Sequence, residues 1–113
     1  MTIVRSRISL TELESIAKAQ FGDLVKAVVD VERGIMSVGG ELHSDEEAQL
    51  LEDGSRQQQL WGVNLYPGVS GPEWIEFDSV INIRPSQGNR SRGVDSPEIR
   101  EAIAAVVTRL VTR

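Results

Sequence analysis

The stretch from Asn82 to Arg92 (NIRPSQGNRSR) concentrates residue types that bind anions. It holds three arginines, two asparagines and one glutamine and no acidic residue, whereas the whole chain has 17 acidic and 12 basic residues. Guanidinium groups form bidentate hydrogen bonds with phosphate or carboxylate, and a tight turn could point backbone N–H groups at the same ion. The candidate ligand-binding residues are Arg84, Gln87, Gly88, Asn89, Arg90 and Arg92.

The same stretch also has a purely structural interpretation. Its single glycine fits neither the P-loop pattern nor the GxGxxG pattern of dinucleotide-binding folds. Arg84 and Arg90 could pair with the acidic segment Glu41–Asp53, while Pro85 and Gly88 only shape a turn. A connection of about twelve residues between a strand and a helix is nevertheless of a length that often carries function. The sequence leaves both interpretations open.

His43 is the only histidine, and it is the candidate general base if the chain is an enzyme. Together with Asp45 or Glu46 and with Arg90, it could support hydrolysis of a phosphoester, provided that the arginine-rich loop folds beside it. A single histidine excludes an HExxH zinc site and any mechanism with two histidines. A lone histidine at the start of a helix can also simply pack on the preceding strand. Whether the chain is an enzyme is therefore open at this point.

A metal site is a further interpretation of the acidic segment Glu41–Asp53, which contains six acidic residues and no basic one. Its ligands would be His43, Asp45 and Glu46, which offer the nitrogen and oxygen donors that divalent metals bind. Acidic residues in the first turn also stabilise a helix, however, and Ser44 with Glu47 has the pattern of a capping box. Because these effects explain four of the residues without a metal, we expect no metal site and no cofactor.

Capping patterns and hydrophobic periodicity predict the elements that must position these residues. Ser9 with Glu12 and Ser96 with Pro97 mark the starts of two helices. Arg33-Gly34 is expected to join two strands in a hairpin. The predicted elements, in order, are a helix after Ser9, strands over 24–32 and 35–42, a helix from Ser44 to Gly54, strands over 60–66 and 74–83, and a helix after Ser96.

The order α-ββ-α-ββ-α predicts an α+β fold: a two-layer sandwich with a mainly antiparallel four-stranded sheet and helices mostly on one face. The first and last helices have apolar stripes that suit this face, and the short acidic helix is expected at an edge. The other face is expected to be wet or covered by a partner, because it carries Lys26, Asp30, Asn64, Glu76, Asp78 and Asn82. Alternation places Trp61 in the core and an exposed Trp74 on the polar face, where it would suit a protein contact.

Composition narrows the classes of protein further. A chain of 113 residues fits a single domain, residues 1–113. The absence of cysteine excludes disulfides and cysteine-based metal sites, and a net charge of −5 argues against broad nucleic-acid binding. There is no signal peptide and no apolar run of membrane-spanning length, which predicts a cytoplasmic protein that does not enter membranes. The expected partners are a small anionic ligand or, alternatively, a protein partner or a second copy in a homodimer.

Five stretches together resemble a known family over nearly the whole chain. They are FGDLVKAVVDVERG, GGELHSDEEAQLLEDGS, LWGVNLYP, WIEFDSVINIRPSQGNRS and the IREAI segment of the last helix. The chain resembles a family of small bacterial proteins of unknown function. The resemblance implies a free-standing small bacterial domain and brings no catalytic or binding residue with it.

Overall fold

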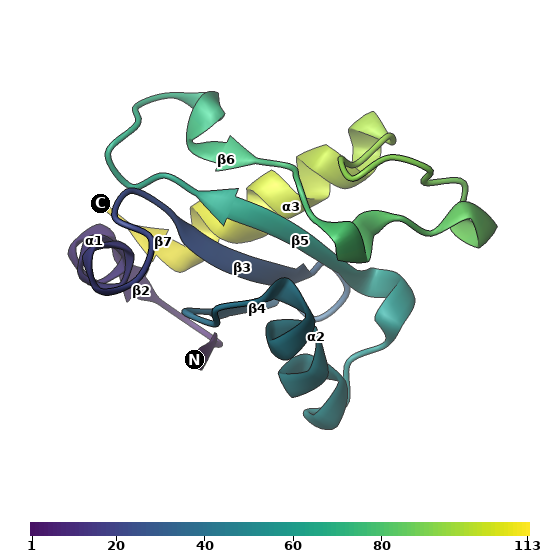
Figure 1. Ribbon diagram of the computed structural model, residues 1–113, viewed down its shortest axis with the longest axis horizontal. Helices are drawn as coiled ribbons and strands as arrows, with labels where there is room; N and C mark the ends of the chain where they lie inside the picture. The colour runs from purple at the N-terminus through teal and green to yellow at the C-terminus, as the bar shows by residue number, and fades with distance from the viewer.

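A computed structural model, which describes residues 1–113, has a five-stranded antiparallel sheet with helices on both faces (Figure 1). The strands in spatial order are β1 (Thr2–Val4), β4 (Ile35–Val38), β3 (Val25–Asp30), β5 (Leu60–Leu65) and β6 (Ile75–Glu76). The helices are α1 (Leu10–Ala19), α2 (His43–Glu52) and α3 (Pro97–Leu110), and β2 (Ile8–Ser9) pairs in parallel with β7 (Val111–Thr112). No helix is both long and apolar enough to span a bilayer. The predicted α+β class is confirmed, but the sheet has five strands instead of four.

The larger hydrophobic core lies between the sheet and the layer formed by α1 and α3. Alternate residues of β3 and β5 face this layer and are almost completely buried: Val25, Ala27, Val29, Trp61, Val63 and Leu65. The two helices contribute the buried residues Leu13, Ala17, Ile103, Val107 and Leu110. Burial of these apolar side chains is the main term that holds the layers together. The alternation predicted for both strands and the core position of Trp61 are confirmed.

α1 and α3 begin where the capping patterns predict. Ser9 Oγ accepts a hydrogen bond from the Glu12 N–H at 3.0 Å, and Glu12 Oε1 accepts one from the Ser9 N–H at 3.3 Å. Ser96 Oγ accepts from the Ile99 N–H at 3.3 Å, and Pro97 is the first residue of α3. Each cap satisfies a backbone donor that the helix itself cannot satisfy.

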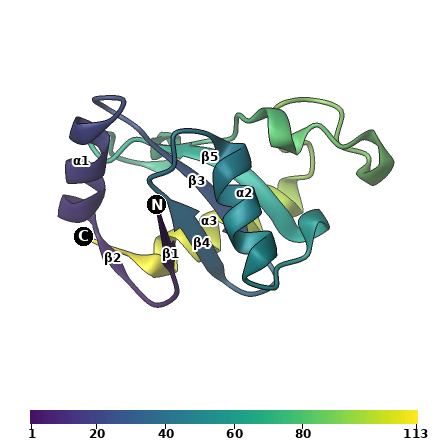
Figure 2. The same cartoon turned by 60° about the horizontal axis from the view of Figure 1, so that its bottom comes forward.

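α2 packs on the opposite face of the sheet, so the expectation that it lies at an edge is wrong (Figures 1 and 2). Leu50 of α2 packs with Val28, Ile35 and Leu60 in a second, smaller core. These three strand residues lie between the polar residues of that face, and they leave an apolar strip that a helix must cover. The protein is therefore a sheet between two helical layers, not a two-layer sandwich.

The long strand predicted over 74–83 is also wrong. Only Ile75 and Glu76 pair with β5, and the chain then turns into a 3₁₀ turn at Val80–Asn82. The reason is that the Asn82 side chain replaces a neighbouring strand: its Oδ1 accepts from the Gly62 N–H at 2.8 Å and its Nδ2 donates to the Gly62 carbonyl at 2.9 Å. A side-chain amide has the same donor and acceptor as a peptide group, so it can complete the edge of β5.

Half of the six polar residues predicted for an open face are buried. Asp30, Asn64 and Asn82 are 0%, 6% and 0% exposed. Asp30 Oδ1 accepts from the N–H groups of Glu32 and Arg33, so this carboxylate shapes the turn between β3 and β4. The expectation of a wet or partner-covered face is therefore wrong for these three residues.

Trp74 is buried, not exposed as predicted, with 5% of its surface accessible. It belongs to the larger core, and the guanidinium group of Arg113 lies 4.8 Å from the centre of its ring. Trp74 thus offers no open surface for a protein contact.

Candidate anion-binding site

Arg84, the first arginine of the loop, is engaged within the protein. Its Nη1 donates to the Gln57 carbonyl at 2.5 Å, its Nη2 donates to the Leu60 carbonyl, and its guanidinium carbon lies 4.2 Å from the centre of the Trp61 ring. It makes no ion pair with the acidic segment 41–53. Arg84 therefore completes the edge of β5 beside Asn82, and an anion would have to compete with these contacts.

The middle of the loop is also held by internal hydrogen bonds. Asn89 is 4% exposed, and its Nδ2 donates to the carbonyls of Asn82 and Gly93 at 2.7 and 2.9 Å. Gln87 Nε2 donates to the Gln58 carbonyl at 3.1 Å, and Gly88 ends the 3₁₀ turn Pro85–Gln87 with a φ of 79°. A positive φ strains any residue with a side chain, so glycine suits this position. These contacts shape the loop.

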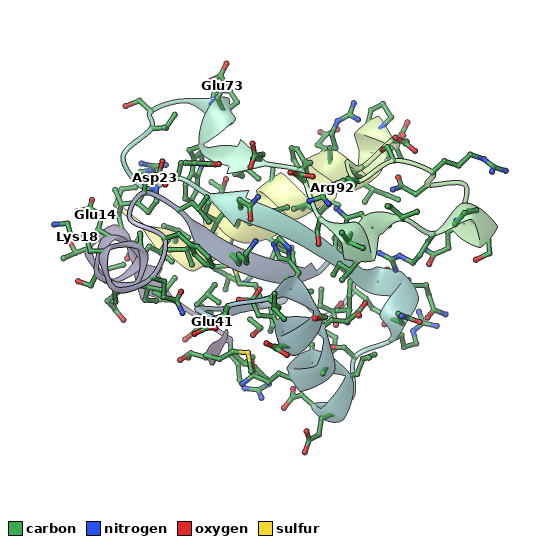
Figure 3. The ribbon with its side chains drawn as sticks, viewed as in Figure 1. Glu14, Lys18, Asp23, Glu41, Glu73 and Arg92 are labelled. Carbon is green, nitrogen blue, oxygen red and sulfur yellow. The ribbon has the colours of Figure 1, made fainter.

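Arg90 and Arg92 have different environments, although only one residue separates them. Arg90 is exposed, and its side chain makes no hydrogen bond or ion pair. Arg92 lies over the middle of the molecule, away from the far end of the loop (Figure 3). Its carbonyl accepts from the Ser79 N–H at 2.9 Å and from Asn82 Nδ2 at 3.0 Å, and its Nε donates to Asp78 Oδ1 at 2.7 Å. The backbone and Nε of Arg92 are thus fixed, while its two terminal nitrogens are free.

A pocket of about 240 Å³ lies where Arg92 meets the N-terminal end of α2. Its polar lining residues come from three parts of the chain: Lys26 from β3, His43 and Ser44 from α2, and Ser79 and Arg92 from the segment after β6. Lys26 forms no salt bridge, and its ammonium group lies 5.3 Å from the centre of the Phe21 ring. Two cationic side chains and a histidine therefore surround one small cavity in a protein of net charge −5.

The start of α2 adds donors to the same pocket. The helix begins at His43, and its N-cap residue Leu42 has no side chain that could accept a hydrogen bond, so the predicted capping box at Ser44 is wrong. The N–H groups of His43 and Ser44 make no hydrogen bond within the protein, whereas those of Asp45 and Glu46 bond to the Leu42 carbonyl. Free N–H groups at a helix N-terminus, together with the helix dipole, attract anions.

His43 is 8% exposed and is fixed to the sheet by a hydrogen bond of 2.8 Å between its Nε2 and the Val63 carbonyl. Burial lowers the pKa of His43 below its ordinary value. The hydrogen bond to the Val63 carbonyl raises the pKa, the positive charges of Lys26 and Arg92 lower it further, and the negative charge of Asp78 raises it. Burial favours the neutral imidazole because it removes water from the charged form. His43 is therefore a neutral ring at pH 7 beside two cations.

The other candidate catalytic residues do not join His43. Asp45 lies in a different pocket, beside Gly39 and Gly40. Glu46 is completely buried, with Oε2 accepting from the Gly40 N–H at 3.0 Å, and burial raises its pKa to about 9. Arg90 does not line the His43 pocket. No three His, Cys, Asp or Glu side chains are grouped in a way that could hold a metal ion.

Of the predicted loop residues, only Arg92 lines the pocket. Two polar residues that also line the pocket, Lys26 and Ser79, were not predicted from the sequence as site residues. The sequence could have indicated Lys26, because it is the only basic residue in an otherwise largely apolar strand. It could not have indicated Ser79, because the strand expected over 74–83 placed that residue on the apolar side. The arginine-rich loop as an anion site stays a prediction, and Arg92 is its one residue that lines this pocket.

A family model described as "Protein of unknown function (DUF5674)" matches residues 2–110 of the chain. No curated protein and no solved structure matches it. The resemblance to a family of unknown function is confirmed, whereas a bacterial source stays a prediction.

Proposed function

We propose that this chain, which belongs to the DUF5674 family, binds a small oxyanion in the pocket between α2 and the segment after β6. The observation that carries the proposal is that Lys26, Arg92, His43 and Ser44 line one cavity, and that the N–H groups of the last two make no hydrogen bond within the protein. These groups are donors or cations, and the cavity of about 240 Å³ can hold a tetrahedral or planar oxyanion.

Asp78 is an opposing charge in direct contact with Arg92. Its Oδ1 accepts a hydrogen bond from Arg92 Nε at 2.7 Å, and its negative charge neutralises part of the positive charge of the pocket. The same bond orients the guanidinium group and leaves its two terminal nitrogens available to a ligand, because a guanidinium group has five donors in a fixed plane. With Lys26 and the N-terminal end of α2, the pocket keeps a net positive character.

A binding experiment with inorganic phosphate tests the proposal. Isothermal titration calorimetry at low ionic strength is expected to detect binding that weakens as salt is added, because salt screens the attraction between charges. The substitutions Arg92→Gln and Lys26→Met should each weaken binding by about tenfold or more, since each removes a charge-assisted contact. Thermal melting of each variant shows whether its fold is retained.

Arg90→Gln is the matched control for this experiment. It removes the same charge from the same loop, but Arg90 is exposed and lies outside the pocket. It should change phosphate affinity by no more than about twofold, as expected for a screened and distant charge. An Arg90→Gln variant that loses as much affinity as Arg92→Gln would place the anion at the tip of the loop and contradict the proposed pocket.

A further inference from the structure

The hydrogen bond between His43 and the sheet fixes which ring nitrogen carries the proton. A carbonyl oxygen can only accept a hydrogen bond, so Nε2 carries the proton and donates the hydrogen bond to the Val63 carbonyl. In a neutral imidazole the other nitrogen, Nδ1, then has a lone pair and no proton. Nδ1 makes no hydrogen bond within the protein.

Nδ1 is also not sealed off from solvent. The polar side-chain atoms that are buried without a partner are Asp30 Oδ2, Glu46 Oε1, Asn64 Oδ1 and Arg84 Nε, and His43 Nδ1 is not one of them. His43 lines the cavity that Lys26 and Arg92 also line. Besides two cations and two serine hydroxyls, which can turn to donate or accept, the cavity therefore contains one group that can only accept, contributed by a residue that is more than nine-tenths buried.

From this arrangement we infer that the pocket selects an oxyanion that still carries a proton, namely inorganic hydrogen phosphate, and that His43 Nδ1 accepts the hydrogen bond from its hydroxyl group. This inference rests on the proposed anion binding and names its ligand class. At about pH 8 inorganic phosphate retains one proton, sulfate has none, and a phosphomonoester, whose second pKa is about 6, has lost its own. For the last two anions an oxygen lone pair would face the lone pair of Nδ1.

The charged groups around His43 preserve this selectivity near neutral pH. Lys26 on β3 and Arg92 on the loop disfavour protonation of the ring, and Asp78 favours it. Ser44, on the helix of His43, carries no charge, and its hydroxyl can turn to donate or accept. Only at acidic pH would Nδ1 of His43 also carry a proton and become a hydrogen-bond donor. The pocket would then bind sulfate as well.

The test compares inorganic phosphate with sodium sulfate and phenyl phosphate on the wild-type protein at about pH 8. Phosphate should bind about tenfold or more tightly than either competitor, because an acceptor facing an acceptor leaves a buried polar atom unpaired. Sulfate affinity should increase at the acidic pH at which His43 becomes protonated. Equal affinity for phosphate and sulfate at pH 8 would overturn the selectivity but not the anion site. Absence of binding by all three anions would overturn both.

Two further measurements assign the selectivity to His43. His43→Phe keeps a planar ring and removes both nitrogens, so it should bind phosphate and sulfate with affinities within about threefold of each other. Long-range ¹H–¹⁵N spectra of the wild-type protein, which need no variant, should show the proton on Nε2 and a marked shift of Nδ1 when phosphate is added. A proton on Nδ1 in the free protein at pH 8 would overturn the inference.

Discussion

Replacing Glu46 with glutamine is expected to stabilise the protein by about 3 kcal/mol at pH 7 and by almost nothing below pH 4.5. Glu46 is completely buried on α2, and its Oε1 has no hydrogen-bond partner. Burial raises its pKa from 4.5 to about 9, so the folded protein keeps a proton that the unfolded chain releases. Glutamine has the same shape as the protonated side chain and no proton to lose.

The sign of the pH dependence follows from that shift. A carboxyl whose pKa is higher in the folded state contributes most to stability below its unfolded pKa of 4.5. The contribution then decreases by about 1.4 kcal/mol per pH unit until the pH reaches the folded value near 9. The difference in unfolding free energy between Glu46→Gln and wild type should therefore grow steadily from pH 5 to pH 8.

Urea denaturation at several pH values measures this difference. Glu52→Gln is the matched control, because Glu52 belongs to the same helix and is exposed. It should leave the pH dependence of stability unchanged. A constant difference between Glu46→Gln and wild type across this pH range would mean that Glu46 is ionised in the folded protein, contrary to its burial.

Asn82→Ala is expected to destabilise the protein by about 3 kcal/mol or more. The Asn82 side chain is fully buried, and its amide satisfies the N–H and carbonyl of Gly62 and the carbonyl of Arg92. Each buried backbone group left without a partner costs roughly 1–3 kcal/mol.

Val80→Ala is the control for this substitution. Val80 lies in the same 3₁₀ turn, is 63% exposed and should change the unfolding free energy by less than about 0.5 kcal/mol. Because Asn82 also holds the Arg92 carbonyl, Asn82→Ala should weaken phosphate binding even at a temperature where the variant is fully folded. A stable Asn82→Ala protein with wild-type stability would show that the edge of β5 is satisfied in another way.

Local signals in the sequence were enough to predict much of the fold. The capping residues Ser9 and Ser96 locate two helix starts, and the alternation of β3 and β5 identifies the larger core. These signals depend on neighbours within a few residues, which is why they can be read without the fold.

The errors arise where distant contacts decide the structure. The alternating segment 74–83 has the period of a strand, but the Asn82 amide and the cap at Ser79 end the strand after Glu76. The position of α2 depended on an apolar strip formed by residues from three strands, which no single strand displays.

For the candidate site, too, local sequence signals could be read, whereas contacts between distant residues could not. Arg92 could be proposed as a candidate anion-binding residue from its type and its neighbours. Its partners could not, because Lys26, His43 and Arg92 are far apart in the sequence and meet only after α2 crosses the sheet and the loop folds back. The arginine-rich segment as an anion site stays a prediction, and within it only Arg92 lines the cavity.

The most direct test of the anion pocket is a phosphate titration followed in ¹H–¹⁵N NMR spectra of the uniformly labelled protein. The largest shifts are predicted for the backbone amides of His43 and Ser44 and for the side chain of Arg92, with small shifts at Arg90. Shifts that are absent at low salt, or that are confined to the loop tip 85–90, would contradict the account.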